Sequence, residues 1–172
     1  MKNRIKKEFF LQDALKLAPA LLGMKLVIHE GKSHTRSFTI YETEAYRGED
    51  DLACHASQGR TARNSIMYNE GGVLYVYLVY GMHWMLNIVA GNAEDPQAVL
   101  IRGLKGIIGP GRLTKALGID KRFNGEDLSH SSRIWLENSN LKLQYKATTR
   151  IGIDYAGPLW KNKPWRFVVS DE

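Results

Sequence analysis

VLYVYLVYGMHWMLNIV, residues 73–89, consists of two strand-like halves that meet at Tyr80-Gly81-Met82. A glycine at such a junction supplies the backbone conformation that a tight hairpin turn requires. Both faces of the first half are apolar, so that strand should be buried on both sides for much of its length. The stretch therefore predicts a β-hairpin, with strands over 73–80 and 83–89 and two large apolar side chains at its tip.

An exposed apolar tip needs a physical reason, because Tyr80 and Met82 would form a wedge in water. One reason is DNA binding, since aromatic wedges that enter the minor groove unstack a base step and bend the duplex. Enzymes that act on a base within a duplex must first extrude it, and a wedge can fill the gap. The alternative is a tip that folds against the protein's own core or a dimer partner. The residues alone leave both interpretations open.

Apolar periodicity elsewhere predicts further strands and a few short helices. Strands are expected over 25–29, 36–43, 97–102 and 165–169, and helices over 13–22, 49–55 and 113–117. The last helix is opened by GPGR at 109–112, where main-chain N–H groups beside Arg112 and Lys115 could hold a phosphate or could form a simple cap. We expect a single α/β domain over residues 1–172, with α+β-like mixing. It would have a curved, largely antiparallel sheet, surrounding short helices and a protruding β-hairpin.

Length and composition limit the classes of protein to which this chain could belong. A chain of 172 residues that is 44% hydrophobic suits one globular domain with a sizeable core. Its single cysteine, Cys54, excludes an intrachain disulfide framework and a cysteine-rich zinc site. The basic N-terminal segment is interrupted by polar residues, and no run approaches the length of a membrane span. We expect a soluble cytoplasmic monomer that does not bind membranes.

Charge is distributed in blocks. Residues 102–122 and 142–166 each carry a net charge of +5, whereas residues 42–51 carry −4. Such blocks suit a protein that binds a polyanion while it keeps carboxylates near a reacting centre. Ordinary solvated faces would produce the same pattern.

The acidic block lies in YETEAYRGEDDLACH, residues 41–55, directly after an apolar run. A strand period of two would place Glu42, Glu44 and Tyr46 on the same face as core-type side chains. A buried carboxylate is costly unless it is paired or used. Taken alone, the stretch favours a strand that ends near Tyr41, with both glutamates solvated.

Several stretches, in order along nearly the whole chain, resemble the alkyladenine (3-methyladenine) DNA glycosylase family in its bacterial form. They are ETEAY at 42–46, His55, GRTARN at 59–64, LYVYLVYGMHWMLNI at 74–88, VLIRGL at 99–104, GPGRLTKALGI at 109–119, and RIGI followed by DYAG at 150–157. His83 and Trp84 depart from the bulky residues common at those positions, and the loop near Gln58 is short by one.

The resemblance implies a monofunctional DNA repair glycosylase of the nucleoid, with no metal or cofactor. It would flip alkylated or deaminated purines from double-stranded DNA and hydrolyse the N-glycosidic bond, leaving an abasic site. The implied substrates are 3-methyladenine, 7-methylguanine, hypoxanthine and ethenoadenine. Glu44 would be the general base, and Arg102 and the carbonyl of Ile151 would hold the attacking water.

The resemblance also implies the binding residues. Tyr46 would stack on one side of the extruded base and His55 with Tyr77 on the other. Groups around Ala53 and His55 would read the base edge, and Asn87 would crowd the 2-amino group of guanine. An aromatic cage of this kind would prefer a base made cationic by alkylation. Tyr80, with Met82 beside it, would enter the base stack. The expected phosphate contacts are Arg60, Arg63, Arg112 and Lys115.

Each assignment has a structural alternative. His55 could be a satisfied structural histidine, Tyr77 could belong to the core, and Asn87 could cap a bulge. Cys54 is expected to be a small buried side chain without nucleophilic character. Glu42 would brace Glu44, and the other three acids of the block would cap and solvate the helix over 49–55. Two rival classes remain, namely a non-catalytic nucleic-acid damage-binding module and a metal-dependent phosphoesterase that uses the acidic block.

Overall fold

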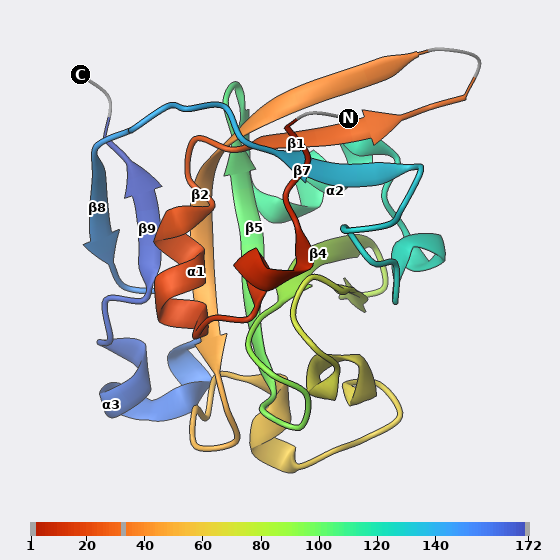
Figure 1. Cartoon of the computed structure of the whole chain (residues 1–172). Helices are drawn as coiled ribbons and strands as arrows, with labels where there is room; N and C mark the ends of the chain where they lie inside the picture. Colours follow the sequence, from red (N-terminus) through yellow and green to blue (C-terminus); the bar gives the residue numbers. More distant parts are fainter. Residues whose placement is uncertain (1–2, 32–33, 171–172) are drawn as a thin grey trace.

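The computed structural model describes residues 3–31 and 34–170. Within these ranges, nine strands form one sheet in which each pair is antiparallel, and short helices lie around it (Figure 1). The main strand order is β3-β4-β5-β2-β1-β7, with β6 beside β5, β9 beside β2 and β8 beside β9. The prediction of an α/β fold built on a largely antiparallel sheet is therefore confirmed.

The strands are β1 (Lys25–His29), β2 (Thr35–Arg47), β3 (Leu74–Val79), β4 (His83–Val89), β5 (Gln97–Leu104), β6 (Ile107–Ile108), β7 (Ile134–Glu137), β8 (Tyr145–Thr148) and β9 (Arg166–Val169). The α-helices are α1 (Ala14–Ala20), α2 (Pro110–Leu117) and α3 (Gly157–Lys161). Single turns of 3-10 helix are η1 (Lys7–Phe10), η2 (His55–Gln58), η3 (Ser65–Tyr68), η4 (Lys121–Phe123) and η5 (Asp154–Ala156).

Most of the expected elements lie within a few residues of their predicted positions, including the β3–β4 hairpin, β1, β5, β9, α1 and α2. Helix α1 begins after Asp13, whose carboxylate accepts a hydrogen bond from the N–H of Leu15 at 2.8 Å. Helix α2 begins at Pro110, whose fixed φ suits a first helical position. Sequence analysis missed β6, β7, β8 and α3, which are short and lack a clear period.

The helix expected over 49–55 is wrong. The chain there forms bends and turns, and helical structure begins only at His55. Asp51 explains the difference, because its carboxylate accepts hydrogen bonds from the N–H groups of Arg47 at 3.2 Å and Ala53 at 3.1 Å. Such side-chain bonds to nearby backbone favour turns over helix.

Strand β2 is longer than expected, and the predicted end near Tyr41 is wrong. Its first half pairs with β1, and its second half pairs with β5 on one edge and β9 on the other. The β2–β5 ladder is irregular at two positions, so that Tyr41 on β2 and Arg102 on β5 have no direct cross-strand partner. Bulges of this kind re-aim side chains. Here they bring Arg102 beside the carboxylates of β2.

The main core lies between the sheet and helices α1 and α2. It includes Leu17 from α1, Leu21 directly after that helix, Leu113 from α2, and Ile40 and Ile101 from the sheet, all without solvent exposure. A second buried cluster, which includes Met67, Tyr68 and Tyr75, packs the segment 54–73 against β3 to β5. Within the residues described, no helix is both long and apolar enough to cross a membrane.

Candidate active site

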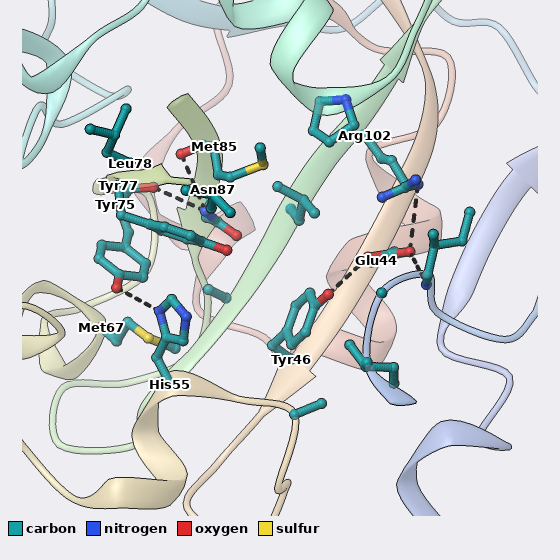
Figure 2. A pocket seen from close by; sticks show the side chains of 18 of the residues that line it. Glu44, Tyr46, His55, Met67, Tyr75, Tyr77, Leu78, Met85, Asn87 and Arg102 are labelled. Atoms are coloured by element: carbon teal, nitrogen blue, oxygen red, sulfur yellow. Dashed lines mark hydrogen bonds and ion pairs between the residues drawn. The ribbon is translucent and has the colours of Figure 1, made fainter. Parts of the chain in front are cut away.

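A cavity of about 510 Å³ opens where β2, β3, β4 and β5 meet the segment 151–155 (Figure 2). It brings together most of the residues that the sequence predicted for the site. These are Glu44, Tyr46, Ala53, His55, Arg63, Tyr77, Tyr80, Asn87, Arg102 and Ile151. Four other predicted residues, Met82, Arg60, Arg112 and Lys115, do not line the cavity.

Glu44 is buried at the cavity wall, with a side-chain exposure of 0%. One carboxylate oxygen, Oε2, accepts a hydrogen bond from the phenol of Tyr46 at 2.8 Å. The other, Oε1, accepts one from the main-chain N–H of Ile151 at 2.9 Å and lies 3.6 Å from Nε of Arg102. The expectation that both glutamates are solvated is therefore wrong. Ile151 contacts Glu44 through its N–H, whereas the resemblance implied its carbonyl as a water ligand.

Burial raises the pKa of Glu44 above its ordinary value. Arg102, the N–H of Ile151 and the phenol of Tyr46 each lower that pKa, and nearby Glu42 raises it further. Arg102 thus favours the ionised carboxylate, but burial has the larger effect on the pKa. A carboxyl group whose pKa is raised is a stronger base than an exposed one.

Glu42 is held by two arginines. Its Oε1 lies 3.0 Å from Nε of Arg102 and accepts a hydrogen bond from Arg166 at 2.7 Å. Gly103 permits this arrangement, because a Cβ there would lie 3.1 Å from the Cβ of Glu42 and 3.2 Å from its Oε2. The predicted bracing of Glu44 by Glu42 would therefore act through Arg102. Glu42 holds Arg102, which faces Glu44.

Aromatic rings form two opposite walls of the cavity, with Tyr46 on one side and His55, Tyr75 and Tyr77 on the other (Figure 2). The His55 and Tyr77 rings are 4.5 Å apart between centroids, and the Tyr75 and Tyr77 rings 5.0 Å. Nδ1 of His55 shares a 2.8 Å hydrogen bond with the phenol of Tyr75. Burial lowers the pKa of His55, with a further contribution from Arg63. The space between the walls can receive a planar ring.

Polar groups lie along the edge of this space. The buried side chain of Asn87 lines the cavity, and its amide donates to the carbonyl of Tyr75 at 3.2 Å. Ala53 lines the cavity from the loop after β2, and its carbonyl accepts a hydrogen bond from the phenol of Tyr155 at 3.2 Å. Tyr155 was not expected in the site.

The tip of the β3–β4 hairpin is exposed, as the sequence predicted for a protruding hairpin. Tyr80 is 88% exposed and Met82 is 69% exposed. Tyr80 also has a φ of +52°, a left-handed conformation that non-glycine residues adopt infrequently. The tip does not fold against the protein's own core, so that part of the alternative is wrong for this chain, and packing against a dimer partner stays a prediction. Tyr80 stands at the rim of the cavity.

The four expected phosphate contacts are exposed, and they lie in two places. Arg60 and Arg63 belong to the loop between η2 and η3, and Arg112 and Lys115 belong to α2. Arg60 is paired with Glu94 at 2.5 Å and lies 4.0 Å above the Tyr68 ring, which leaves it less available to a ligand. Arg63 alone of the four also lines the cavity.

The buried ion pair between Asp51 and Arg150 was missed by sequence analysis. Both side chains have 0% exposure, and Arg150 donates to the two carboxylate oxygens of Asp51 at 2.6 and 2.9 Å. Arg150 also donates to the carbonyl of Ala45 at 3.0 Å and lies 4.8 Å from the centroid of the Tyr46 ring. The expectation that Asp51 caps a helix in solvent is wrong. Nothing local could have revealed a partner 99 positions away.

The remaining acids and the cysteine do not suggest a different chemistry. Glu49 is exposed and accepts a hydrogen bond from the phenol of Tyr68 at 2.7 Å, and Asp50 is exposed. Within the part of the chain that the structure describes, no three His, Cys, Asp or Glu side chains group as metal ligands. Cys54 is buried, and burial raises its pKa to about 12, so its thiolate is scarce at neutral pH.

Comparisons with known proteins agree on one family. The family model for methylpurine-DNA glycosylase matches residues 8–108 and 105–172. A protein of Borreliella burgdorferi (strain ZS7) is 45% identical over 178 aligned positions, which cover 95% of this chain and 94% of the relative. A protein of Desulfitobacterium hafniense (strain Y51) is 40% identical, with 98% and 96% covered. A protein of Psychrobacter cryohalolentis is 38% identical, with 97% and 92% covered. All three are provisionally named 3-methyladenine DNA glycosylases.

Proposed function

This chain belongs to the methylpurine-DNA glycosylase family, and on that premise we propose that it removes damaged purines from duplex DNA by hydrolysing the N-glycosidic bond. The observation that carries the proposal is the position of Glu44. A carboxylate with 0% side-chain exposure lines a cavity between two aromatic walls, and a cation, an N–H and a phenol hold it there.

Glu44 acts as the general base in this proposal. It takes one proton from a water as the oxygen of that water bonds to C1′ of the flipped nucleotide. The bond from C1′ to the base nitrogen breaks, and the base leaves with its electron pair. Arg102 and the main chain at Ile151 position the water and the carboxylate. The raised pKa of Glu44 supports this role, because a carboxylate of higher pKa accepts a proton from water more readily.

The aromatic walls bind the extruded base. Tyr46 stacks on one face of the base and His55 with Tyr77 on the other, a contact worth about 1–3 kcal/mol per base. Ala53 and Asn87 contact its edge, and Tyr80, with Met82 beside it, fills the gap left in the duplex. Arg60, Arg63, Arg112 and Lys115 contact phosphates. The substrates are 3-methyladenine, 7-methylguanine, hypoxanthine and ethenoadenine, and the partner is double-stranded DNA.

The enzyme is monofunctional and leaves an abasic site. A glycosylase that also cleaves the backbone uses an amine nucleophile to form a Schiff base. Among the described residues that line the cavity there is no lysine. Three of the five carboxylates in residues 42–51 are also engaged by arginines, since Glu42 and Glu44 face Arg102 and Asp51 is paired with Arg150. This arrangement favours water activation by Glu44 over a metal-dependent phosphoesterase.

The test is single-turnover release of hypoxanthine from a duplex that carries one such base, in the presence of a chelator. We expect the wild type to release the base, and Glu44→Gln to bind the duplex but to release it at least about 10²-fold more slowly. Glu70→Gln is the matched control, because Glu70 is exposed and does not line the cavity. It should react at the wild-type rate.

Other outcomes would contradict the proposal in distinct ways. Tight binding without release of hypoxanthine or a methylated purine by the wild type would favour a damage-binding module. Equal rates for the wild type and Glu44→Gln would place the general base elsewhere. Loss of activity with the chelator, together with cleavage of the DNA backbone, would indicate a metal-dependent phosphoesterase.

A further inference from the structure

Arg63 differs from the other charged groups around the cavity in how it is paired. The acids Glu42, Glu44 and Asp51 face three arginines, namely Arg102, Arg166 and Arg150. Among the residues described, no carboxylate lies within ion-pair distance of Arg63, and its recorded hydrogen bond goes to the carbonyl of Leu78 at 3.1 Å. Arg63 therefore adds a positive charge to a cavity whose other charges balance.

This charge lies against the aromatic wall. The guanidinium carbon of Arg63 is 5.4 Å from the centroid of the Tyr77 ring, and Tyr77 packs on His55. The lowered pKa of His55 is consistent with a cationic neighbour, and it keeps that imidazole uncharged at neutral pH. Within the wall, the positive charge belongs to Arg63.

The opposite wall has a guanidinium as well. Arg150 lies 4.8 Å from the centroid of the Tyr46 ring but does not line the cavity, so it contacts the ring from outside. The two principal stacking rings, Tyr46 and Tyr77, are thus each already in contact with an arginine. A ring attracts a cation through the negative potential of its face, and a first cation nearby offsets that attraction for a second.

We infer that Arg63 is a specificity-determining residue that favours neutral damaged purines in the base pocket over bases that carry a positive charge. This inference rests on the proposed function, and it opposes the expectation that the aromatic cage prefers a cationic base. The effect is strongest in the complex, because DNA that covers the cavity mouth removes the water that screens Arg63.

Arg63 can also contribute a favourable contact to a neutral base. The purine edge of hypoxanthine, like that of guanine, carries acceptors at O6 and N7, and a guanidinium is a donor that suits such a pair. Methylation at N7 removes one of these acceptors and adds the positive charge. Both the lost acceptor and the added charge disfavour the methylated base beside Arg63.

The test is a competition between two duplexes of the same sequence, one with hypoxanthine and one with 7-methylguanine, at mildly acidic pH where 7-methylguanine keeps its charge. The measured quantity is the ratio of the two release rates. We expect Arg63→Gln to shift this ratio toward 7-methylguanine by roughly tenfold. Arg63→Lys keeps the positive charge and should shift it much less.

Arg112→Gln is the matched control, because Arg112 is an exposed arginine that does not line the cavity. Removal of a phosphate contact should slow both substrates equally and leave the ratio unchanged. If Arg63→Gln also slows both substrates equally, Arg63 is only a phosphate contact and the inference is overturned. If the wild type releases neither base, the proposed function itself fails, which is a separate outcome.

Discussion

At the scale of single residues, Glu44 is held between two opposing influences. Burial favours the protonated carboxyl, whereas Arg102 and two hydrogen-bond donors favour the carboxylate. Burial has the larger effect and raises the pKa of Glu44, while Arg102 and the two donors limit the rise. Its raised pKa makes the carboxylate of Glu44 a stronger base toward water than an exposed carboxylate. The contacts of Glu44 should therefore determine the pH dependence of the enzyme.

Tyr46→Phe tests this control. The substitution keeps the stacking ring but removes the phenol that donates to Glu44 at 2.8 Å, so the pKa of Glu44 should rise. A general base works when deprotonated, and activity is lost as pH falls through its pKa. The acid limb of the single-turnover pH profile should therefore move to higher pH, by roughly one unit. Tyr77→Phe is the control, since the phenol of Tyr77 has no recorded hydrogen bond to Glu44. An unmoved limb in Tyr46→Phe would show that another group sets the profile.

At the scale of elements, the site depends on how β2 is joined to its neighbours. The irregular β2–β5 ladder places Arg102 beside Glu42 and Glu44. The turn at 48–54, which follows β2, contains Asp51, and the segment that follows β8 contains Arg150. The buried ion pair between these two residues links the turn to that segment. The same segment supplies the N–H of Ile151 to Glu44. The Asp51–Arg150 pair thus joins the two chain segments that form one wall of the cavity.

Arg150→Met should lower the free energy of unfolding by about 3–5 kcal/mol, because it leaves the carboxylate of Asp51 buried without its cation. Urea denaturation measures the change. Arg60→Gln is the matched control, since its pair with Glu94 has side chains that are 46% and 72% exposed, and its loss should cost no more than about 1 kcal/mol. An equally small loss for both variants would contradict a stabilising role for the buried pair.

At the scale of the whole molecule, several of the features proposed to contact DNA lie around one opening. The exposed hairpin tip, the loop with Arg63 and the segment 151–155 all contribute to the rim of the cavity, and Pro110 brings the start of α2 to the same place. A duplex that lies over this opening could contact the tip, the base pocket and the basic side chains together. The hairpin tip is the part of this surface that should matter only when a base must leave a duplex.

Tyr80→Ala tests the tip as a wedge. We expect it to weaken binding to a hypoxanthine-containing duplex by roughly tenfold, the scale of one lost aromatic stack. Binding to the same lesion in single-stranded DNA should change little, because no gap has to be filled there. Leu141→Ala, which removes an exposed apolar side chain outside the cavity, is the control. An equal loss on both forms of DNA would contradict the wedge role and indicate a general contact.

The order of the strands could be predicted only in part, whereas the hairpin was clear from the sequence. Residues 73–89 combine a continuous apolar pattern with a glycine turn, and these are local signals. The β2–β5 and β2–β9 pairs join distant segments, and no local pattern specifies such partners. The short strands β7 and β8 have too few residues to show a period. They become strands because β1 and β9 offer them free hydrogen-bonding edges.

Local sequence patterns were enough to predict the kind of fold, the family resemblance and most of the polar and aromatic residues that line the cavity. The burial of these residues and the partners that hold them became apparent only in the folded chain. Glu44 appeared solvated from its local sequence, since the cost of burying it is met by Arg102, Ile151 and Tyr46, two of them far along the chain. Asp51, which was expected to lie in solvent, is buried against Arg150 for the same reason. The energy of a charge depends on burial and on partners in space, and neither is a property of the neighbouring residues in the sequence.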